Sequence, residues 1–227
     1  SGHHYQVGDK VIGMSRFGAY TKHININHHY LQPLPVGWSL DQGAALPVQG
    51  LTAWYGLHEL GKLSSSQVVL VQSAAGGVGL QAMEIIKKEG ATAIAVIGSA
   101  NKSETLVDRT GIDRSQIIVR GKSFQRDLQQ ILKKLSRDGL DIAFDAVYGR
   151  YFKDTYQALN PRGRYLLYGA ADMMTRGSRP NFFSLIPKYL MRPRLDPLSM
   201  ISDNKSMMAF NLIWLWQEIK LMQRVPG

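Results

Sequence analysis

The stretch VLVQSAAGGVGLQA, residues 69–82, passes within a few positions from an apolar run to a glycine-rich turn. The apolar run predicts a buried strand over 68–72, because unbroken aliphatic runs are typical of strands covered on both faces. After Gly77 the apolar residues return at helical spacing, which predicts a helix that Gly90 ends. A strand, a glycine turn and a helix in this order occur at phosphate sites and also in plain packing turns, so the neighbouring sequence decides between them.

Downstream of this unit, strand-like apolar runs alternate with amphipathic stretches. In the clearest of these, Phe124, Leu128 and Ile131 recur at helical spacing on one face. Strands joined by helices of this size imply right-handed crossovers and a parallel sheet covered on both faces. The predicted fold class is α/β, a doubly wound parallel sheet of the Rossmann type. Further strands are expected at 93–99, 116–120, 141–147 and 164–170, further helices at 102–111, 124–135 and 152–159, and a turn at 160–163.

The first part of the chain has a different pattern. The segment 7–14 and the alternating segment 18–26 are expected to contain strands. Ser39 is of a type that caps a helix, and a short helix is expected after it. A longer helix is expected over 47–61. The helical pattern from 47 onward marks the expected start of the larger domain.

The composition is that of an ordinary folded protein, with 44% hydrophobic and 19% charged residues in a chain of 227. Cysteine is absent, which excludes disulfides and thiolate catalysis within this chain and fits a reducing compartment, so a cytoplasmic location is expected. The net charge of +10 is spread along the chain, and no nucleic-acid-binding signature accompanies it, so no nucleic-acid partner is expected. The six histidines include no H-x-x-x-H pair, and no metal site is expected.

The glycine turn has the spacing of the dinucleotide fingerprint G-x-G-x-x-G, with Ala74 at the first position. In that pattern Gly76 lets the backbone approach a pyrophosphate, and Gly79 lets the helix pack closely on the strand. The amides of the turn stand at a helix N-terminus, where partial positive charge favours an anion. The candidate cofactor-binding residues of the turn are Ala75, Gly76, Gly77 and Val78.

The residues about twenty positions later bear on which nucleotide is bound. An NAD site has Asp or Glu at the end of the second strand, where the carboxylate holds the ribose hydroxyls. No acidic residue lies between Gly90 and Lys102, and Ser99 stands in this window. A hydroxyl and an ammonium group would bind a 2′-phosphate, and Arg120, just past the third strand, would add to this site. The cofactor predicted from Ser99, Lys102 and Arg120 is NADPH.

The chain resembles the zinc-independent quinone oxidoreductase branch of the medium-chain dehydrogenase/reductase superfamily. The tail of the chain is most similar to the subgroup named after vesicle amine transport protein 1 (VAT-1). The resemblance implies that residues 1–46 are part of a GroES-like β-barrel catalytic domain. It implies that 47–227 form a Rossmann NADPH-binding domain, and that the chain is truncated at both ends. It is carried by VGDKV (7–11), GAYTKHI (18–24), GAALPVQGLTAWYGL (43–57), VLVQSAAGGVG (69–79), AFDAVYG (143–149), YLLYGAA (165–171), NFFSLIPK (181–188) and DPLSMISDNKSMMAFNLIWL (196–215).

The same resemblance implies further cofactor contacts. Gln49 and Thr52 would lie beside the nicotinamide, and residues 146–149 would lie over its ribose. The segment Tyr168, Gly169 and Ala170 would line the other side of the cofactor. The chain itself offers Tyr20, Tyr55 and Tyr168 as proton donors, but packing is the favoured explanation for each, so no catalytic residue is named.

Two functions are expected in order of preference. The first is an NADPH-dependent oxidoreductase that transfers hydride to a quinone or an α,β-unsaturated carbonyl compound without zinc. The second is a lipid- or membrane-associated, VAT-1-like nucleotide-binding protein with little turnover. It is motivated by the resemblance and by the segment 181–194, where apolar and basic residues are mixed as in an interfacial helix.

A homodimer is also expected. In the tail at about 205–223, residues 207–212 have strand character and the pattern then continues as a helix. The resemblance places this strand at the edge of the sheet. Unpaired backbone groups at a sheet edge form a template for a second chain. Closed twofold pairing would cover the large apolar side chains that follow, Phe210, Leu212, Ile213, Trp214 and Trp216. The alternative is a monomer in which a further C-terminal segment covers them.

Overall fold

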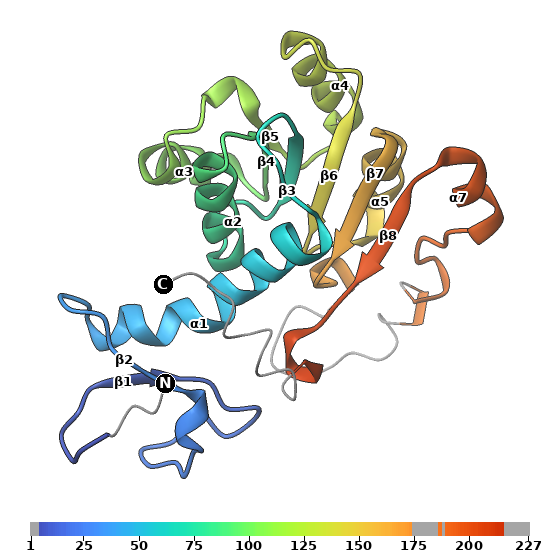
Figure 1. Cartoon of the computed structure of the whole chain (residues 1–227). Helices are drawn as coiled ribbons and strands as arrows, with labels where there is room; N and C mark the ends of the chain where they lie inside the picture. Colours follow the sequence, from blue (N-terminus) through green and yellow to red (C-terminus); the bar gives the residue numbers. More distant parts are fainter. Residues whose placement is uncertain (1–4, 174–185, 188, 216–227) are drawn as a thin grey trace. The chain divides into compact units, whose positions relative to one another are not determined.

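A computed structural model of the chain describes residues 5–173, 186–187 and 189–215 (Figure 1). The described residues form two compact units. One contains the residues up to Thr52 and from Leu212 onward, and the other contains Ala53–Asn211. The domain boundary expected after residue 46, and the domain types assigned on its two sides, stay predictions.

The first unit contains a two-stranded antiparallel sheet. Strand β1 (Val11–Gly13) pairs with β2 (Leu31–Pro33), and the 3₁₀ helix η1 (His28–Tyr30) precedes β2. The strand expected over 18–26 is wrong, because these residues have no strand pairing and are almost all exposed. Alternation of apolar and polar residues produces a strand only where a neighbouring backbone is aligned to pair with it.

Helix α1 (Leu40–Trp54) begins earlier than the expected start at 47. Ser39 caps it as predicted: its hydroxyl oxygen accepts from the Gln42 amide at 3.2 Å, and the Gln42 side chain accepts from the Ser39 amide at 2.9 Å. Pro47 lies inside the helix, where a proline removes one hydrogen bond without ending the helix. The helix continues as a π-helical segment, η2 (Tyr55–Leu60).

The second unit contains a six-stranded sheet in the order β5-β4-β3-β6-β7-β8, and every pair in it is parallel. The order reverses between β3 and β6, the switch point at which open α/β sheets bind ligands. The doubly wound parallel fold predicted from the sequence is therefore confirmed. The strands are β3 (Val68–Gln72), β4 (Thr92–Ile97), β5 (Ile117–Val119), β6 (Leu140–Asp145), β7 (Leu159–Leu167) and β8 (Ser206–Ala209).

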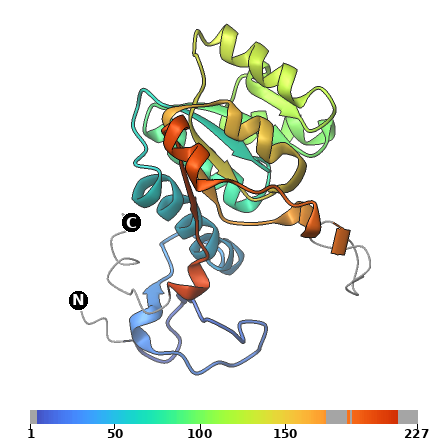
Figure 2. The same cartoon turned by 90° about the vertical axis from the view of Figure 1, so that its right-hand side faces the viewer.

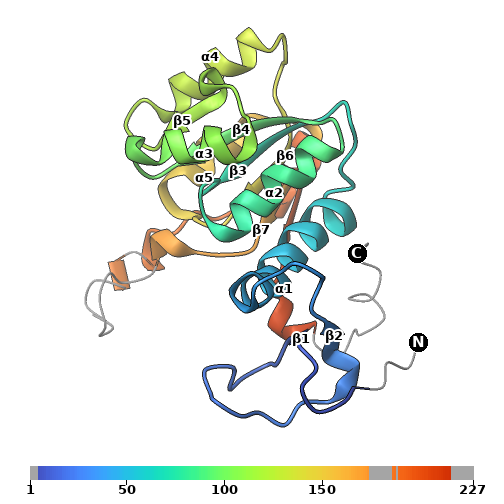
Figure 3. The same ribbon diagram turned by 90° about the vertical axis from the view of Figure 1, so that its left-hand side faces the viewer.

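Helices cover both faces of this sheet (Figure 1, Figure 3). On one face, Val69 and Val71 of β3 pack in the cluster that holds the apolar sides of α2 and α3. On the other face, Val68 and Leu70 of β3 pack in the cluster that holds α4 and α5. All five residues of β3 are buried because the strand is covered on both sides. The helices are α2 (Gly77–Lys88), α3 (Ser103–Thr110), α4 (Phe124–Lys134) and α5 (Phe152–Gln157), with short 3₁₀ helices at η3 (Ala100–Lys102), η4 (Arg114–Gln116), η5 (Gly149–Tyr151) and η6 (Ala171–Met173).

The turn expected at 160–163 lies inside strand β7 instead. The pairing of β6 with β7 shifts register between Leu140 and Ile142, and Arg162 has φ 72°. The sequence Asn-Pro-Arg-Gly has the chemistry of a turn, but here it forms an irregularity within a continuous strand.

A short helix that the sequence did not indicate, α7 (Pro197–Asp203), precedes β8. The Asp196 side chain accepts from the Leu198 amide, and Pro197 occupies the first turn. Figure 2 looks onto this edge of the sheet, where β8 and α7 are nearest the viewer. The strand expected over 207–212 is present as β8, at the edge of the six-stranded sheet, although it covers only Ser206–Ala209. In place of the helix expected to continue to about 223, the described residues after β8 form the 3₁₀ helix η7 (Leu212–Trp214). The rest of that expected helix lies outside the described residues.

We predict that Gly79→Ala lowers the free energy of unfolding by about 1–3 kcal/mol, as overpacking does. A Cβ atom at Gly79 would lie 2.3 Å from the Ser73 carbonyl oxygen and 2.7 Å from the Ala74 Cα, and both are backbone atoms. Gly121→Ala is the matched control, because a Cβ there would meet only the Val119 carbonyl oxygen at 3.9 Å. Urea unfolding of the three proteins measures the effect, and equal stability of the two variants would contradict the prediction.

Candidate functional site

The turn after β3 brings the backbone to the carboxyl edge of the sheet. Ser73 has φ 56°, and the Gly76 amide donates to the Ser73 carbonyl oxygen at 2.8 Å, which closes the turn. The Ala74 amide donates to the Val96 carbonyl oxygen of β4 at 3.0 Å. The turn is thus fixed by its own backbone and by the neighbouring strand.

The N-terminus of α2 leaves amides free at this edge. Gly76 is the N-cap residue, and no side chain caps the helix. The Leu80 amide makes the first helical bond, to the Gly76 carbonyl oxygen at 2.8 Å, so the amides of Gly77, Val78 and Gly79 precede the hydrogen-bond ladder. A Cβ atom at Gly76 would meet only the Ser73 carbonyl oxygen, at 3.2 Å, so the side of the turn that it faces is otherwise open. This arrangement has the donors and the open approach that an anion needs.

Arg120 crosses from the end of β5 toward this turn. Its Nη2 atom donates to the Ser73 hydroxyl oxygen at 3.3 Å. It passes Gly98 at the end of β4, where a Cβ atom would lie 2.9 Å from Nη2. The Arg120 Nε atom is buried and has no hydrogen-bond partner among the described residues. The ends of three neighbouring strands are therefore linked by one cationic side chain.

Ser99 and Lys102 stand beside this link. Ser99 is exposed and its hydroxyl donates to the Asn101 side-chain oxygen at 2.6 Å. Lys102 ends η3, and its exposed side chain has no ion-pair partner within the described part of the chain. Glu104, the first acidic residue after this stretch, lies 3.8 Å from the Arg114 guanidinium. The edge next to the turn thus carries hydroxyl and cationic groups.

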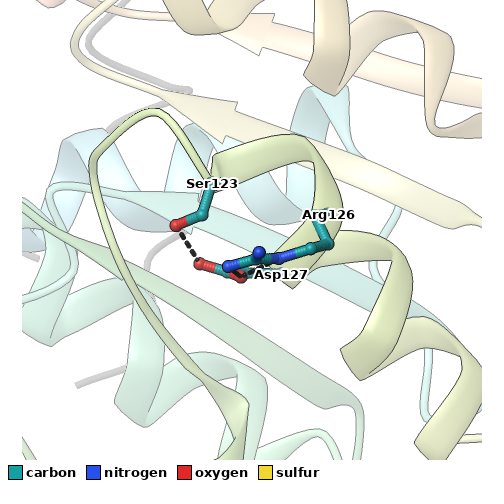
Figure 4. Close-up of polar contacts among 3 residues, drawn as sticks. All are labelled: Ser123, Arg126 and Asp127. Atoms are coloured by element: carbon teal, nitrogen blue, oxygen red, sulfur yellow. Dashed lines mark hydrogen bonds and ion pairs between the residues drawn. The ribbon is translucent and has the colours of Figure 1, made fainter.

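The start of α4, just after Arg120, is closed by its own side chains (Figure 4). The Ser123 hydroxyl donates to Asp127 Oδ2 at 2.7 Å, and the Arg126 guanidinium donates to Asp127 Oδ1 at 3.4 Å. The Asp127 carboxylate in the first turn also opposes the partial charge of the helix N-terminus. These contacts fix the chain beyond Arg120. The side chains of Ser123, Arg126 and Asp127 bond to one another at this helix end.

Asp145 closes β6 and is 1% exposed. Its Oδ1 atom accepts from the amides of Val147, at 2.6 Å, and Tyr148, at 3.1 Å. Its Oδ2 atom accepts from the Tyr148 amide at 3.1 Å and from the buried Tyr165 hydroxyl. Burial raises the pKa of Asp145, and the hydrogen bonds from Tyr165 and the two amides, together with the charge of Arg120, oppose this shift.

The loop after β6 is strained. Tyr148 has φ 58° and ψ −157°, a region that costs a side chain about 1–3 kcal/mol. Gly149 follows with φ 72° and packs on Asp172, whose carboxyl oxygen is 3.8 Å from the Arg150 Nε atom. The Tyr148 hydroxyl donates to the Pro193 carbonyl oxygen at 2.5 Å. Strain of this kind persists only where several contacts fix it.

The tyrosines considered as proton donors are placed differently. Tyr20 is fully exposed in the first unit. Tyr168 stacks on Phe144 with ring centroids 4.2 Å apart, and burial raises its pKa above the usual range, helped by the charge of Asp145. Burial also raises the pKa of Tyr55, whose ring meets Phe210 edge-on at 5.1 Å. A raised pKa makes a tyrosine a weaker acid, so these rings support packing rather than proton transfer.

The structure groups the predicted site residues unequally. One end of the carboxyl edge holds the turn residues Ala75–Val78 together with Ser99, Lys102 and Arg120. The segment Tyr168–Ala170 follows β7, toward the other end of that edge. Gln49 and Thr52 belong to the other compact unit. The Thr52 hydroxyl donates to the Val48 carbonyl oxygen at 2.7 Å within α1. Gln49 is partly buried in the same helix.

Sequence reasoning missed two buried polar residues at this edge. Asp145 could have been noticed as an acidic residue that ends an apolar strand. Gln72 ends β3 with 0% exposure, and neither polar atom of its side chain has a hydrogen-bond partner among the described residues. By register Gln72 faces the same side of the sheet as Asp145.

The described part of the chain contains no group of three or more His, Cys, Asp or Glu side chains that could hold a metal ion. The expectation that this protein works without zinc stays a prediction. None of the described helices is both long enough and apolar enough to cross a bilayer. In the segment 181–194, residues 181–185 and 188 lie outside the described residues, whereas Ile186, Tyr189 and Leu190 are exposed.

Relatives of this chain are found by sequence. The chain is 33% identical over 219 residues to the synaptic vesicle membrane protein VAT-1 homolog of Danio rerio, covering 96% of this chain and 44% of that protein. It is 27% identical to the VAT-1 homolog of Homo sapiens, over 97% of this chain and 54% of that protein. The chain thus spans about half the length of these relatives.

Solved structures with this fold include oxidoreductases. CurK enoyl reductase superposes with a TM-score of 0.75 at 28% identity, covering 98% of this chain and 60% of that chain. The quinone oxidoreductase of Thermus thermophilus, solved also in complex with NADPH, has a TM-score of 0.75 at 22% identity, with 96% and 62% covered. At 22% identity, the similarity to the quinone oxidoreductase shows that the two proteins share a fold.

The match to a family model agrees with the topology. Residues 77–196 match the model of the zinc-binding dehydrogenases, which is more than half of the chain. The matched range begins at α2, directly after the glycine turn, and contains β4 to β7. The chain belongs to the zinc-binding dehydrogenase family, within the medium-chain dehydrogenase/reductase superfamily.

Proposed function

We propose that the protein to which this chain belongs binds NADPH and transfers hydride to a quinone or an α,β-unsaturated carbonyl compound. The observation that carries the proposal is the carboxyl edge of β3, β4 and β5. There the uncapped amides of α2 lie beside hydroxyl and cationic side chains, and no acidic residue stands between Gly90 and Lys102. Enoyl and quinone reductases among the solved structures with this fold support the reaction class.

The residues at this edge fit a phosphorylated dinucleotide. The amides of Gly77 and Val78 would hold the pyrophosphate, and the open side of Gly76 would let it approach. Ser99, Lys102 and Arg120 would hold the 2′-phosphate. When bound, the nicotinamide supplies the hydride, and the protein binds and orients it. The loop 146–149 and the segment 168–170 would orient the ring.

Arg120 has a second task in this proposal. Its guanidinium already bonds to Ser73, so it shapes the turn as well as adding positive charge. A side chain held in this way needs little reorganisation when an anion arrives, which is favourable for binding. Lys102 is exposed and has no ion pair among the described residues. Its flexible side chain can therefore bring the ammonium group into contact with a bound phosphate.

The reaction is tested by following NADPH absorbance with the full-length protein and a panel of quinones and enones. We expect oxidation with at least one of these acceptors and none without acceptor. The second candidate function is membrane association, favoured by the exposed side chains of Ile186, Tyr189, Leu190 and Met191. Sedimentation with vesicles of phosphatidylserine and phosphatidylcholine runs beside the assay. Vesicle binding without turnover on any acceptor would reverse the preference.

The choice of cofactor follows from the charge at the edge. We expect NADPH to bind at least about tenfold more tightly than NADH, or about 1.4 kcal/mol, and Lys102→Ala to narrow this ratio. Fluorescence titration measures both affinities. Equal affinities of the wild-type protein for NADPH and NADH would contradict the assignment of a 2′-phosphate site to this edge.

Two variants serve as controls for this titration. Lys133→Ala removes an equally exposed lysine at the end of α4 and should leave the ratio unchanged. Gly76→Val should abolish binding of both nucleotides while the protein stays folded. The Gly76 backbone has φ −86°, which any residue can adopt, and a Cβ atom there meets one backbone atom at 3.2 Å. Unchanged NADPH affinity in a folded Gly76→Val protein would show that the pyrophosphate does not bind at this turn.

A homodimer through the outer edge of β8, which pairs with no other strand among the described residues, is a further part of the proposal. The Phe210 side chain, expected to be covered by the second chain, packs instead against Tyr55 and Tyr168 inside the second unit. The Phe210 amide bonds to Leu167 of β7, so by alternation the Ala209 amide points away from the sheet. Light scattering should give a dimer for the wild-type protein and a monomer for Ala209→Pro, which removes that outward donor. A monomeric wild-type protein at micromolar concentration would reject the dimer.

A further inference from the structure

The strained loop after β6 is held from inside the protein. Tyr148 and Gly149 both have positive φ, 58° and 72°. The loop is short and directly follows a buried strand, so its conformation is decided by the groups that bond its amides. Those groups are the two carboxyl oxygens of Asp145.

Asp145 is suited to this task by its chemistry. A carboxylate is only an acceptor, and three donors converge on it: the amides of Val147 and Tyr148 and the hydroxyl of Tyr165. Burial and the charge of Asp145 raise the pKa of the Tyr165 hydroxyl far above its usual value, so that hydroxyl keeps its proton and donates it. With Asp145 1% exposed, water does not take the place of these donors.

The loop in turn holds the segment after β7. Three amides of that segment donate to carbonyl oxygens of residues 145–147, and Gly169 packs so closely that a Cβ atom would lie 2.8 Å from the Ala146 carbonyl oxygen. A change in the loop therefore moves both segments together. The bonds run from Tyr168 to Asp145, from Ala171 to Ala146 and from Asp172 to Val147, each at 3.0 Å.

We propose that Asp145 is a positioning residue for the nicotinamide half of the cofactor: its buried carboxyl group fixes the loop 146–149, and through it the segment 168–170, in the geometry that receives the ring. The inference rests on the proposed function, because that function gives these two segments a ligand. Asp145 itself touches neither cofactor nor substrate in this proposal. It acts through the backbone that it bonds.

Two substitutions separate the hydrogen bonds from the charge. Asp145→Asn keeps one oxygen that accepts from the amides of Val147 and Tyr148, and its NH₂ group can donate to the Tyr165 hydroxyl oxygen. Asp145→Ala leaves both amides and the hydroxyl without an acceptor. Thr110→Val is the matched control, because the buried Thr110 hydroxyl also accepts a backbone amide two residues on, from Ile112 at 3.3 Å, in a helix away from this loop.

The experiment measures amide hydrogen exchange without cofactor, NADPH affinity and steady-state kinetics on the full-length protein. In Asp145→Ala we expect exchange at Val147 and Tyr148 to be at least about tenfold faster, because their acceptor is gone. We expect NADPH binding weaker by at least about tenfold, with a lower kcat at saturating NADPH, because the ring is no longer held. Asp145→Asn should stay within about threefold of the wild-type protein in all of these. Thr110→Val should lower the unfolding midpoint and leave exchange at 147–148 and NADPH affinity unchanged.

The readouts distinguish this inference from the proposed function. Unchanged exchange at Val147 and Tyr148 in Asp145→Ala would overturn the inference even if NADPH turnover is confirmed. Faster exchange with unchanged NADPH affinity and kcat would also overturn it, because the loop would then be held for another reason. A wild-type protein that binds no NADPH would overturn both, and its exchange data would still show which groups hold the loop. If Asp145→Ala does not fold, a large loss of NADPH affinity in Asp145→Asn without faster exchange would overturn the inference.

Discussion

The close approach of Gly79 to the backbone of Ser73 and Ala74 determines the rest of the site. Because a Cβ atom at Gly79 would overlap backbone atoms, α2 can lie directly against the end of β3 only with glycine there. That contact aims the first amides of α2 along the carboxyl edge of the sheet. Strand β3 pairs with both β4 and β6, so it fixes the positions from which Arg120 and Asp145 approach the same edge.

Burial explains why the sheet could be predicted from the sequence. The central strands are covered on both faces, so they are mostly apolar runs with glycine or polar residues after them. The strands expected at 68–72, 93–99 and 141–147 lie within two residues of β3, β4 and β6. Local chemistry misled where tertiary contacts outweighed it. Residues 160–163 have turn chemistry but continue β7, because the register of its pairing with β6 shifts there. Residues 18–26 alternate like a strand but lie without strand pairing.

The candidate site could be predicted only where its residues are neighbours in sequence or end adjacent strands. The glycine turn and the positions after β4 and β5 follow from that rule, and the bond between Arg120 and Ser73 joins them. Asp145 was missed because its role depends on Tyr165, which lies twenty residues away on the neighbouring strand β7. Helix α7 was missed because it is short, and only Asp196 and Pro197 mark its start. Gln49 and Thr52 lie in the other compact unit, where no spacing rule within the sheet applies.

The two ends of the carboxyl edge are built on opposite principles. At the end formed by β3, β4 and β5, donors are left available: the amides of Gly77 and Val78 precede the helical ladder, and Lys102 is exposed. At the end formed by β6 and β7, amide donors are used within the protein: the Asp145 carboxyl group accepts from Val147 and Tyr148, and carbonyl oxygens of 145–147 accept from Tyr168, Ala171 and Asp172. Open donors suit the charged part of a ligand, whose binding energy comes from forming new hydrogen bonds. A closed and strained backbone suits an uncharged ring, since the protein must fix the ring's orientation and the cost of ordering the loop has already been met in folding. An edge that joins both is suited to hold a phosphorylated cofactor at one end and to direct its reactive ring at the other.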